Sequence, residues 1–163
     1  MAVRLTDSDI QRLLTERKPL PEDFRNRTKL KSKRGHKESE LALKGVDGSE
    51  FLLFMRQSEE NPIDFSIILT YQIPKSNVVF RLLRCNGKSH EHTNKIEGNT
   101  FYDFHIHQAT ERYQDSGFQE DTFAEPTRDF SDFAGALDCL LKQGAFDVRG
   151  DLEFPLFDAK ESP

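Results

Sequence analysis

The chain has 163 residues, of which 36% are hydrophobic and 31% charged, and its 14 phenylalanines are enough to build a folded core. Its longest apolar run is residues 51–55, far short of the roughly 20 residues that a transmembrane helix needs. These features exclude membrane-spanning and fibrous proteins. With no apolar leader and only two cysteines, we expect a cytoplasmic protein without a disulfide framework.

Positive charge is concentrated near the N-terminus. Residues 1–37 carry a net charge of +6 and residues 38–163 a net charge of −11. Residues 25–37, the basic ribbon, contain seven basic residues and no acidic one. Five basic residues occupy alternate positions and would share one side of an extended chain; they are Arg25, Arg27, Lys29, Lys31 and Lys33. The ribbon is either a solvated edge strand or linker, a nucleic-acid surface, or a docking surface for an acidic protein.

The first predicted element is a helix over residues 6–18. Thr6 and Asp9 form a capping-box pattern, a narrow apolar stripe follows, and two prolines end the helix. The chain therefore divides into four parts: residues 1–24 with the helix and a proline-bounded turn, the ribbon 25–37, an α+β domain 38–157, and a frayed tail 158–163.

Five strands are predicted next: residues 38–44, 49–57, 63–73, 77–85 and 100–107. The first two form a hairpin around a glycine-rich turn, and the third alternates between apolar and polar residues, as half-buried strands do. The fourth ends at Asn86-Gly87, which is a strong signal for a two-residue hairpin loop. Residues 108–126 are polar and irregular, with a helical turn predicted at 110–114.

The last predicted helix covers residues 127–142, with Thr127 as its N-cap and apolar residues at helical spacing. Residues 145–157 are predicted to add a short edge strand that buries Phe154 and Phe157. The order of elements predicts an α+β fold. It consists of a meandering antiparallel sheet of about five or six strands with an N-terminal helix and a C-terminal amphipathic helix.

Four of the five histidines lie within 18 residues, as the pairs His90-Glu91-His92 and His105-Ile106-His107. Strand alternation places Phe101, Asp103, His105 and His107 on one face, and the apolar Tyr102, Phe104 and Ile106 on the core face. A two-residue loop at Asn86-Gly87 would pair Cys85 with Lys88, Leu83 with His90 and Arg81 with His92. Two neighbouring strands would then gather four imidazoles on one surface.

Three interpretations of this cluster are open. Histidines at alternate positions of a strand can ligate zinc or another divalent transition metal. They can also serve as acid and base on a phosphodiester, or simply satisfy a polar network. No phosphate-binding P-loop, dinucleotide fingerprint or nucleophile elbow is present, which argues against those enzyme classes.

The leading hypothesis is an RNase-like protein that acts without a metal or other cofactor. One histidine would accept the 2′-hydroxyl proton and another would protonate the leaving oxygen. The expected catalytic residues are His90, His92, His105, His107, Glu111, Arg112 and Tyr113. Arg81 and the basic ribbon would bind the substrate. The alternatives are a metal-binding protein that uses the four histidines, and a non-catalytic module that binds protein or nucleic acid; no membrane contact is expected.

Two runs carry a resemblance to a known family. They are Asn86-Gly87-Lys88-Ser89-His90-Glu91-His92-Thr93-Asn94 and Phe104-His105-Ile106-His107-Gln108-Ala109-Thr110-Glu111-Arg112-Tyr113. Residues 38–145 resemble DUF6978, a prokaryotic family of unknown function with this spacing and a C-terminal amphipathic helix. The resemblance implies a prokaryotic cytoplasmic protein and carries no activity with it.

Overall fold

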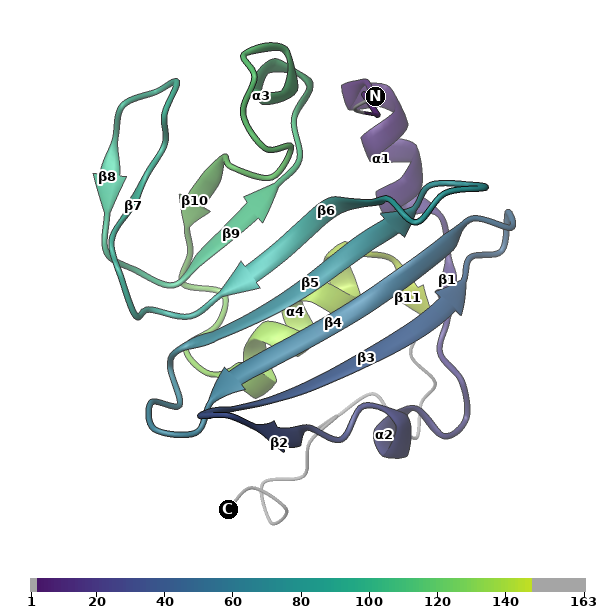
Figure 1. Ribbon diagram of the computed structural model, residues 1–163, viewed down its shortest axis with the longest axis horizontal. Helices are drawn as coiled ribbons and strands as arrows, with labels where there is room; N and C mark the ends of the chain where they lie inside the picture. The colour runs from purple at the N-terminus through teal and green to yellow at the C-terminus, as the bar shows by residue number, and fades with distance from the viewer. Residues whose placement is uncertain (1–2, 148–163) are drawn as a thin grey trace.

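Seven antiparallel strands form the main sheet of the computed structural model, which describes residues 3–147 (Figure 1). Their order across the sheet is β2-β3-β4-β5-β6-β9-β10. They are β2 (Lys31–Lys33), β3 (His36–Lys44), β4 (Glu50–Ser58), β5 (Phe65–Gln72), β6 (Val79–Asn86), β9 (His105–Gln108) and β10 (Ala124–Pro126). Between β6 and β9 the chain leaves the sheet to form a hairpin of β7 (His92–Thr93) and β8 (Thr100–Phe101).

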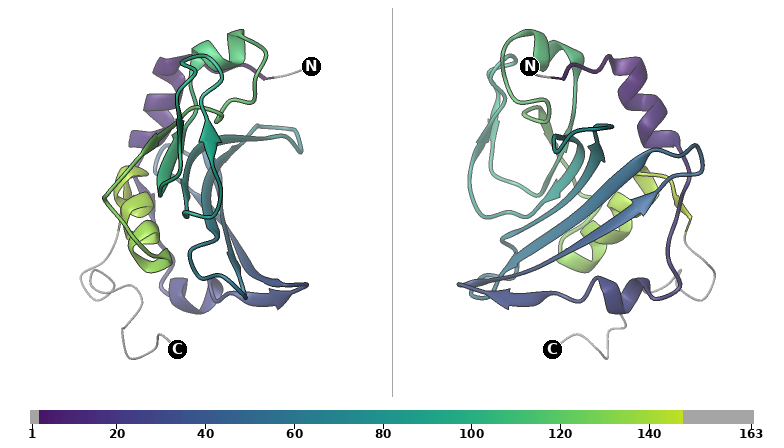
Figure 2. Two further views of the ribbon diagram at one scale, coloured as in Figure 1. Left: turned by 90° about the vertical axis from the view of Figure 1, so that its left-hand side faces the viewer. Right: turned by 45° about the vertical axis from the view of Figure 1, so that its right-hand side comes forward.

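The longer helices α1 (Asp7–Thr15) and α4 (Phe133–Gln143) lie on the same side of the main sheet (Figure 2). Two short helices, α2 (Phe24–Arg27) and α3 (Glu111–Asp115), complete the helices of the described residues. The core lies between the long helices and the inner sheet face, where β4 and β5 bury alternate residues. The other face of the sheet, which carries no helix within residues 3–147, is the outer face (Figure 2).

The predicted fold class is confirmed: the fold is α+β, the sheet is antiparallel and meandering, and one helix lies near each end. The sheet is wider than expected because two edge strands, β2 and β10, have only three residues each. Strand β2 reads Lys-Ser-Lys and is exposed throughout, so it lacks the apolar alternation that reveals a strand. Strand β10 ends in a proline, a residue that a sheet tolerates at its edge.

The basic ribbon is not one extended segment, so the prediction that its five alternate cations share a side is wrong. Arg25 and Arg27 lie in the short helix α2, and only Lys31 and Lys33 lie in a strand. Lys33 forms an ion pair with Glu38 at 2.6 Å. Because β2 is the edge strand at the far end of the sheet from β9 and β10, these lysines are remote from the histidines of β9.

Helix α1 begins as predicted but ends earlier. The Thr6 hydroxyl accepts a hydrogen bond from the Asp9 amide at 3.0 Å, and the Asp9 carboxylate accepts one from the Thr6 amide at 3.1 Å. The helix ends at Thr15, three residues before the predicted end. This early end releases Lys18 to enter the short strand β1 (Lys18–Pro19), which pairs in parallel with β11 (Phe146–Asp147).

Lys18 is fully buried, and its ammonium group joins the ends of the two long helices. It donates hydrogen bonds to the carbonyl oxygens of Leu13, Leu14, Glu16 and Gly144, at 2.9, 3.2, 2.8 and 2.5 Å. It also lies 4.6 Å from the centre of the Phe51 ring. Burial lowers the pKa of Lys18 to about 8, so the side chain is still mostly charged at neutral pH. A lysine near a helix C-terminus satisfies carbonyl groups that the helix itself cannot pair.

Helix α4 begins at Phe133, six residues after the predicted start, and Thr127 is not its N-cap. The cap is Asp132, whose carboxylate accepts a hydrogen bond from the Gly135 amide at 2.8 Å. The Thr127 amide instead donates to the Phe104 carbonyl oxygen at 2.9 Å, which extends the pairing of the β9–β10 region. The sequence alone did not distinguish the two positions, because threonine and aspartate are both common N-cap residues.

Substitution of Asp132 and of Thr127 should change the free energy of unfolding by different amounts. Asp132→Ala should lower the free energy of unfolding by about 1 kcal/mol, because it leaves a helix-end amide without its acceptor. Thr127→Ala removes no helix cap, only an exposed hydrogen bond from the Asp129 amide, and should cost less than about 0.5 kcal/mol. Urea denaturation followed by circular dichroism measures both, and equal losses in the two variants would contradict this assignment of the cap.

The prediction of a two-residue hairpin at Asn86-Gly87 is also wrong. Strand β6 pairs with β5 and β9, and the residues after Gly87 form a loop instead of a returning strand. The Gly87 amide donates to the Phe65 carbonyl oxygen at 2.9 Å. A Cβ atom on Gly87 would lie 1.8 Å from the Ile63 carbonyl oxygen, so glycine is needed here for close approach to neighbouring backbone.

The predicted strand 100–107 is two strands in different sheets, β8 and β9, separated by residues 102–104. Phe104 and Ile106 pack against the core as expected, whereas Tyr102 is 52% exposed and does not. Of the strand predicted over 145–157, Phe146–Asp147 is present as β11. Phe154, Phe157 and the tail 158–163 lie outside the described residues.

Candidate metal centre

Strand register places the two histidines of β9 on the outer face of the sheet. Opposed residues of antiparallel strands share a face, and β6 pairs Arg84 with His107 and Asn86 with His105. Ile106, between the two histidines, points to the core side. The prediction that the imidazoles and the apolar side chains lie on opposite faces is therefore correct for the residues of β9.

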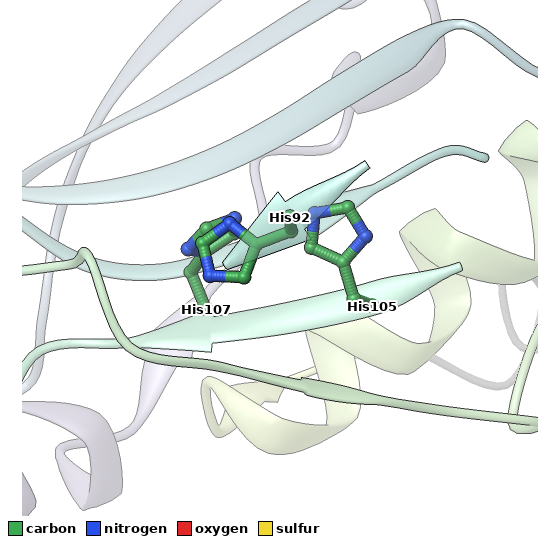
Figure 3. A group of neighbouring side chains, drawn as sticks. All are labelled: His92, His105 and His107. Carbon is green, nitrogen blue, oxygen red and sulfur yellow. The ribbon is translucent and has the colours of Figure 1, made fainter. Parts of the chain in front are cut away.

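The β7–β8 hairpin brings a third histidine to the same place. The ring of His92 lies 5.5 Å from that of His105 and 4.9 Å from that of His107, measured between ring centres. One ring nitrogen from each histidine lies within 4.8 Å of the others (Figure 3). The ring of Phe101, which is opposite His92 in the hairpin, packs against both His92 and His105.

The two histidines of β9, predicted to lie on the more polar side of the strand, are buried. His105 is 1% exposed and His107 4%. Burial lowers the pKa of His105 to about 4 and that of His107 to about 2, because a charged imidazolium is poorly solvated there. Both rings are therefore neutral at pH 7, the form in which an imidazole can ligate a metal ion.

Hydrogen bonds fix which nitrogen of each ring carries the proton. The Nδ1 of His105 donates to the Asp103 carbonyl oxygen at 2.7 Å, and the Nδ1 of His107 donates to the Asp121 carbonyl oxygen at 2.8 Å. A carbonyl oxygen can only accept, so the Nε2 of each neutral ring carries a lone pair. The Nε2 atoms of both rings can therefore act as metal ligands.

His92 is oriented in the same way by Asn94. The Asn94 side chain is 1% exposed, and its Oδ1 accepts from the Ala124 amide at 2.9 Å while its Nδ2 donates to the Ala124 carbonyl oxygen at 2.8 Å. These two bonds set the orientation of the amide. The Nε2 of His92, at 2.9 Å from Asn94 Oδ1, is therefore the donor, and its Nδ1 carries the lone pair.

A buried ion-pair network borders the histidines. Asp121 is 1% exposed, and its carboxylate lies 3.0 Å from Arg84 and 3.3 Å from Arg81. Burial raises the pKa of Asp121, and the two guanidinium groups oppose that shift. Since the backbone of Asp121 also binds His107, this residue links the imidazoles to the two arginines.

An open cleft of about 260 Å³ gives access to the three imidazoles. Its lining combines the three histidines with cationic and amide side chains: Arg81, Arg84, Asn86, His90, His92, His105, His107, Gln119, Asp121 and Thr122. Arg81, predicted to bind substrate, thus lies at the site. His90 lines the cleft as well, but it is exposed and its Nδ1 contacts the Ser89 hydroxyl at 3.0 Å, outside the group of three.

Glu111, Arg112 and Tyr113 begin helix α3, and the structure does not bring them into this cleft. Arg112 and the Tyr113 hydroxyl both contact the Glu97 carboxylate in the turn between β7 and β8. Glu111 accepts hydrogen bonds from Arg4 and from the Asp7 amide. These contacts anchor the hairpin that carries His92, and they anchor the N-terminal segment to α3.

Five other residues were predicted to bind substrate, and none of them lines the cleft; they are Arg25, Arg27, Lys29, Lys31 and Lys33. Sequence reasoning missed Asn86, Asn94 and Asp121, which orient or border the imidazoles. Asp121 has no spacing signal, because its contacts join separate segments of the chain. Asn94 lies two residues after His92, but the bonds to Ala124 that fix its orientation come from a separate segment. Asn86 has the signature of a turn residue, which conceals its place beside His105.

The described residues contain no helix with the length and apolar character needed to cross a bilayer. No curated protein and no solved structure matches the chain. The model of a family described as a family of unknown function, DUF6978, matches residues 5–143 and so includes the histidines, Asn94 and Asp121. The resemblance seen in the two histidine-containing runs thus extends over most of the chain, which belongs to the DUF6978 family.

Proposed function

We propose that the protein binds a divalent transition-metal ion, with Zn²⁺ as the best fit, through His92, His105 and His107. The observation that carries the proposal is the set of three fixed tautomers. Each ring donates one N–H to a protein oxygen, which leaves one lone pair on each ring. One ring nitrogen from each of the three histidines lies within 4.8 Å of the others. Histidine ligands of metal ions are typically oriented in this way by carbonyl or carboxylate oxygens.

The spacing and chemistry of the three donors suit zinc. Nitrogens at about 2.1 Å from a tetrahedral ion are about 3.4 Å apart, so modest side-chain rotations would bring these donors into place. Three imidazole ligands without a carboxylate would leave the fourth position for a ligand from the cleft. A metal ion in such a site lowers the pKa of a bound water or polarises a bound substrate.

The same observations favour metal binding over acid–base catalysis without a metal. A general acid or base works best with a pKa near the working pH. Burial holds the pKa of His105 and of His107 well below that range, and their Nδ1 protons are already donated to carbonyl oxygens. The RNase-like mechanism stays a prediction. Nucleic-acid binding by Lys31 and Lys33 is a second prediction, which does not depend on the histidines.

Metal titration tests the proposal directly. Chelator-stripped protein should bind one equivalent of Zn²⁺ by calorimetry. One equivalent of Co²⁺ should give the intense visible absorption of a tetrahedral site. His92→Ala and His107→Ala should each weaken binding about 100-fold or more, since each removes one of three ligands. His36→Ala, which changes a histidine on β3 that contacts Glu38, should leave the affinity unchanged.

Because His107 is buried, its variant can fail to fold, and His92, which is half-buried on the outer hairpin, provides the cleaner test. The proposal would be overturned if folded wild-type protein bound no stoichiometric metal. It would also be overturned if folded His92→Ala bound Zn²⁺ as tightly as His36→Ala.

A further inference from the structure

The cleft contains unused hydrogen-bond donors beside the three nitrogen acceptors. The Nε of Arg84 is buried and has no hydrogen-bond partner among the described residues. The Oδ1 of Asn86 accepts from the Ser66 hydroxyl at 2.8 Å, which turns Nδ2 toward the Nε2 of His105 at the long distance of 3.5 Å. A buried donor without a good acceptor indicates a missing partner.

A metal ion would release the donor of Asn86 completely. The lone pair of His105 Nε2 is the one acceptor that Nδ2 approaches among the described residues, and coordination would occupy that lone pair. The amide would then direct its N–H at whatever binds in the fourth position of the ion. Arg84 and Asn86 lie two residues apart on β6 and therefore face the same side of the sheet.

The charges of the site indicate what that ligand is. Arg81 and Arg84 are balanced by Asp121 and by Glu120, whose carboxylate lies 3.9 Å from Arg81. Three imidazole ligands carry no negative charge, and Asp121, the carboxylate that lines the cleft, already pairs with two arginines. The two positive charges of a bound metal ion would therefore lack a counter-charge among the described residues that line the cleft. Uncompensated charge in a poorly solvated site is costly, and a doubly negative ligand removes that cost.

Resting on the proposed metal centre, we propose that the cleft binds the phosphate group of a free phosphate or a phosphate monoester. One oxygen coordinates the metal ion, and others accept hydrogen bonds from Asn86 and Arg84. A phosphate dianion matches both the charge and the number of donors, whereas a carboxylate carries one charge and two oxygens.

Calorimetry on zinc-loaded protein, freed of excess metal, tests this inference with inorganic phosphate, phenyl phosphate and acetate. Inorganic phosphate should bind at least tenfold more tightly than acetate, and at least tenfold more tightly than it binds to chelator-stripped protein. Tighter binding of phenyl phosphate than of inorganic phosphate would identify the monoester as the natural form of the ligand, and the reverse would identify free phosphate.

Asn86→Leu, which keeps the branching at Cγ but removes the donor, should weaken phosphate binding about tenfold and leave zinc stoichiometry at one. The double variant Arg84→Gln/Asp121→Asn should do the same without leaving either charge buried alone. Arg56→Gln is the matched control, because Arg56 lies on the same face of the sheet but outside the cleft.

Two results would overturn the inference while the metal centre stands: zinc-loaded protein that binds phosphate no better than acetate, or phosphate binding that neither variant changes. Failure of zinc itself to bind would instead contradict the proposed function, and the preceding metal titration reports it separately.

Discussion

Lys18→Met should lower the free energy of unfolding by about 3–5 kcal/mol, because it leaves buried acceptors without a donor. The ammonium group of Lys18 donates to four carbonyl oxygens, three of them at the C-terminal end of α1 and one at Gly144 after α4. Methionine fits the same space without supplying a proton. Urea denaturation monitored by circular dichroism should show a much lower midpoint with a similar slope.

Lys29→Met provides the control, since Lys29 is an exposed residue that follows α2. It should change the free energy of unfolding by no more than about 0.5 kcal/mol. A loss below about 1 kcal/mol in Lys18→Met would show that the buried ammonium does not hold the two helix ends together.

Gly87→Ala should cost about 3 kcal/mol, because the added methyl group has no space. Its carbon would lie 1.8 Å from the Ile63 carbonyl oxygen and 3.0 Å from the Phe65 ring. Backbone cannot move aside as a flexible side chain can, so the start of β5 or the end of β6 must shift. Thermal and urea denaturation of the purified variant measure the loss.

Gly98→Ala separates this steric effect from ordinary backbone strain. Gly98 has a φ of +81°, and a Cβ atom on it would meet no atom of another segment within 4 Å, so alanine should cost only about 1–2 kcal/mol. If both variants lost the same stability, the close approach at Gly87 would not be the reason for glycine there.

The central strands could be predicted because their burial is periodic. Residues 63–73 alternate between apolar and polar side chains, and β5 buries Phe65, Ile67 and Leu69 on its inner face. The edge strands could not be found in this way, since β2 is exposed throughout and β10 buries only Ala124. Helix ends were less certain than helix positions, because several residues near each end have the chemistry of a cap.

The sequence predicted the part of the candidate site that depends on the spacing of residues within one strand. Alternation on β9 was enough to place His105 and His107 on one face. His92 reaches them by another route, through the β7–β8 hairpin, because Gly87 pairs with the backbone of β5 and prevents an immediate return of the chain. The bonds between Asn94 and Ala124 and between His107 and Asp121 connect separate segments, and one sequence alone contains no pattern for them.

The parallel pairing of β1 with β11 also sets an order of events during synthesis. Lys18 and its acceptor at Gly144 are 126 residues apart. At the usual rate of about 5–20 residues per second, roughly 6–25 seconds pass between their appearance. Helix α1 emerges first, yet Lys18 beside its C-terminal end cannot reach its acceptor at Gly144 until α4 is complete. The first segment to be made is therefore among the last to dock, and closing so long a loop slows the final step of folding.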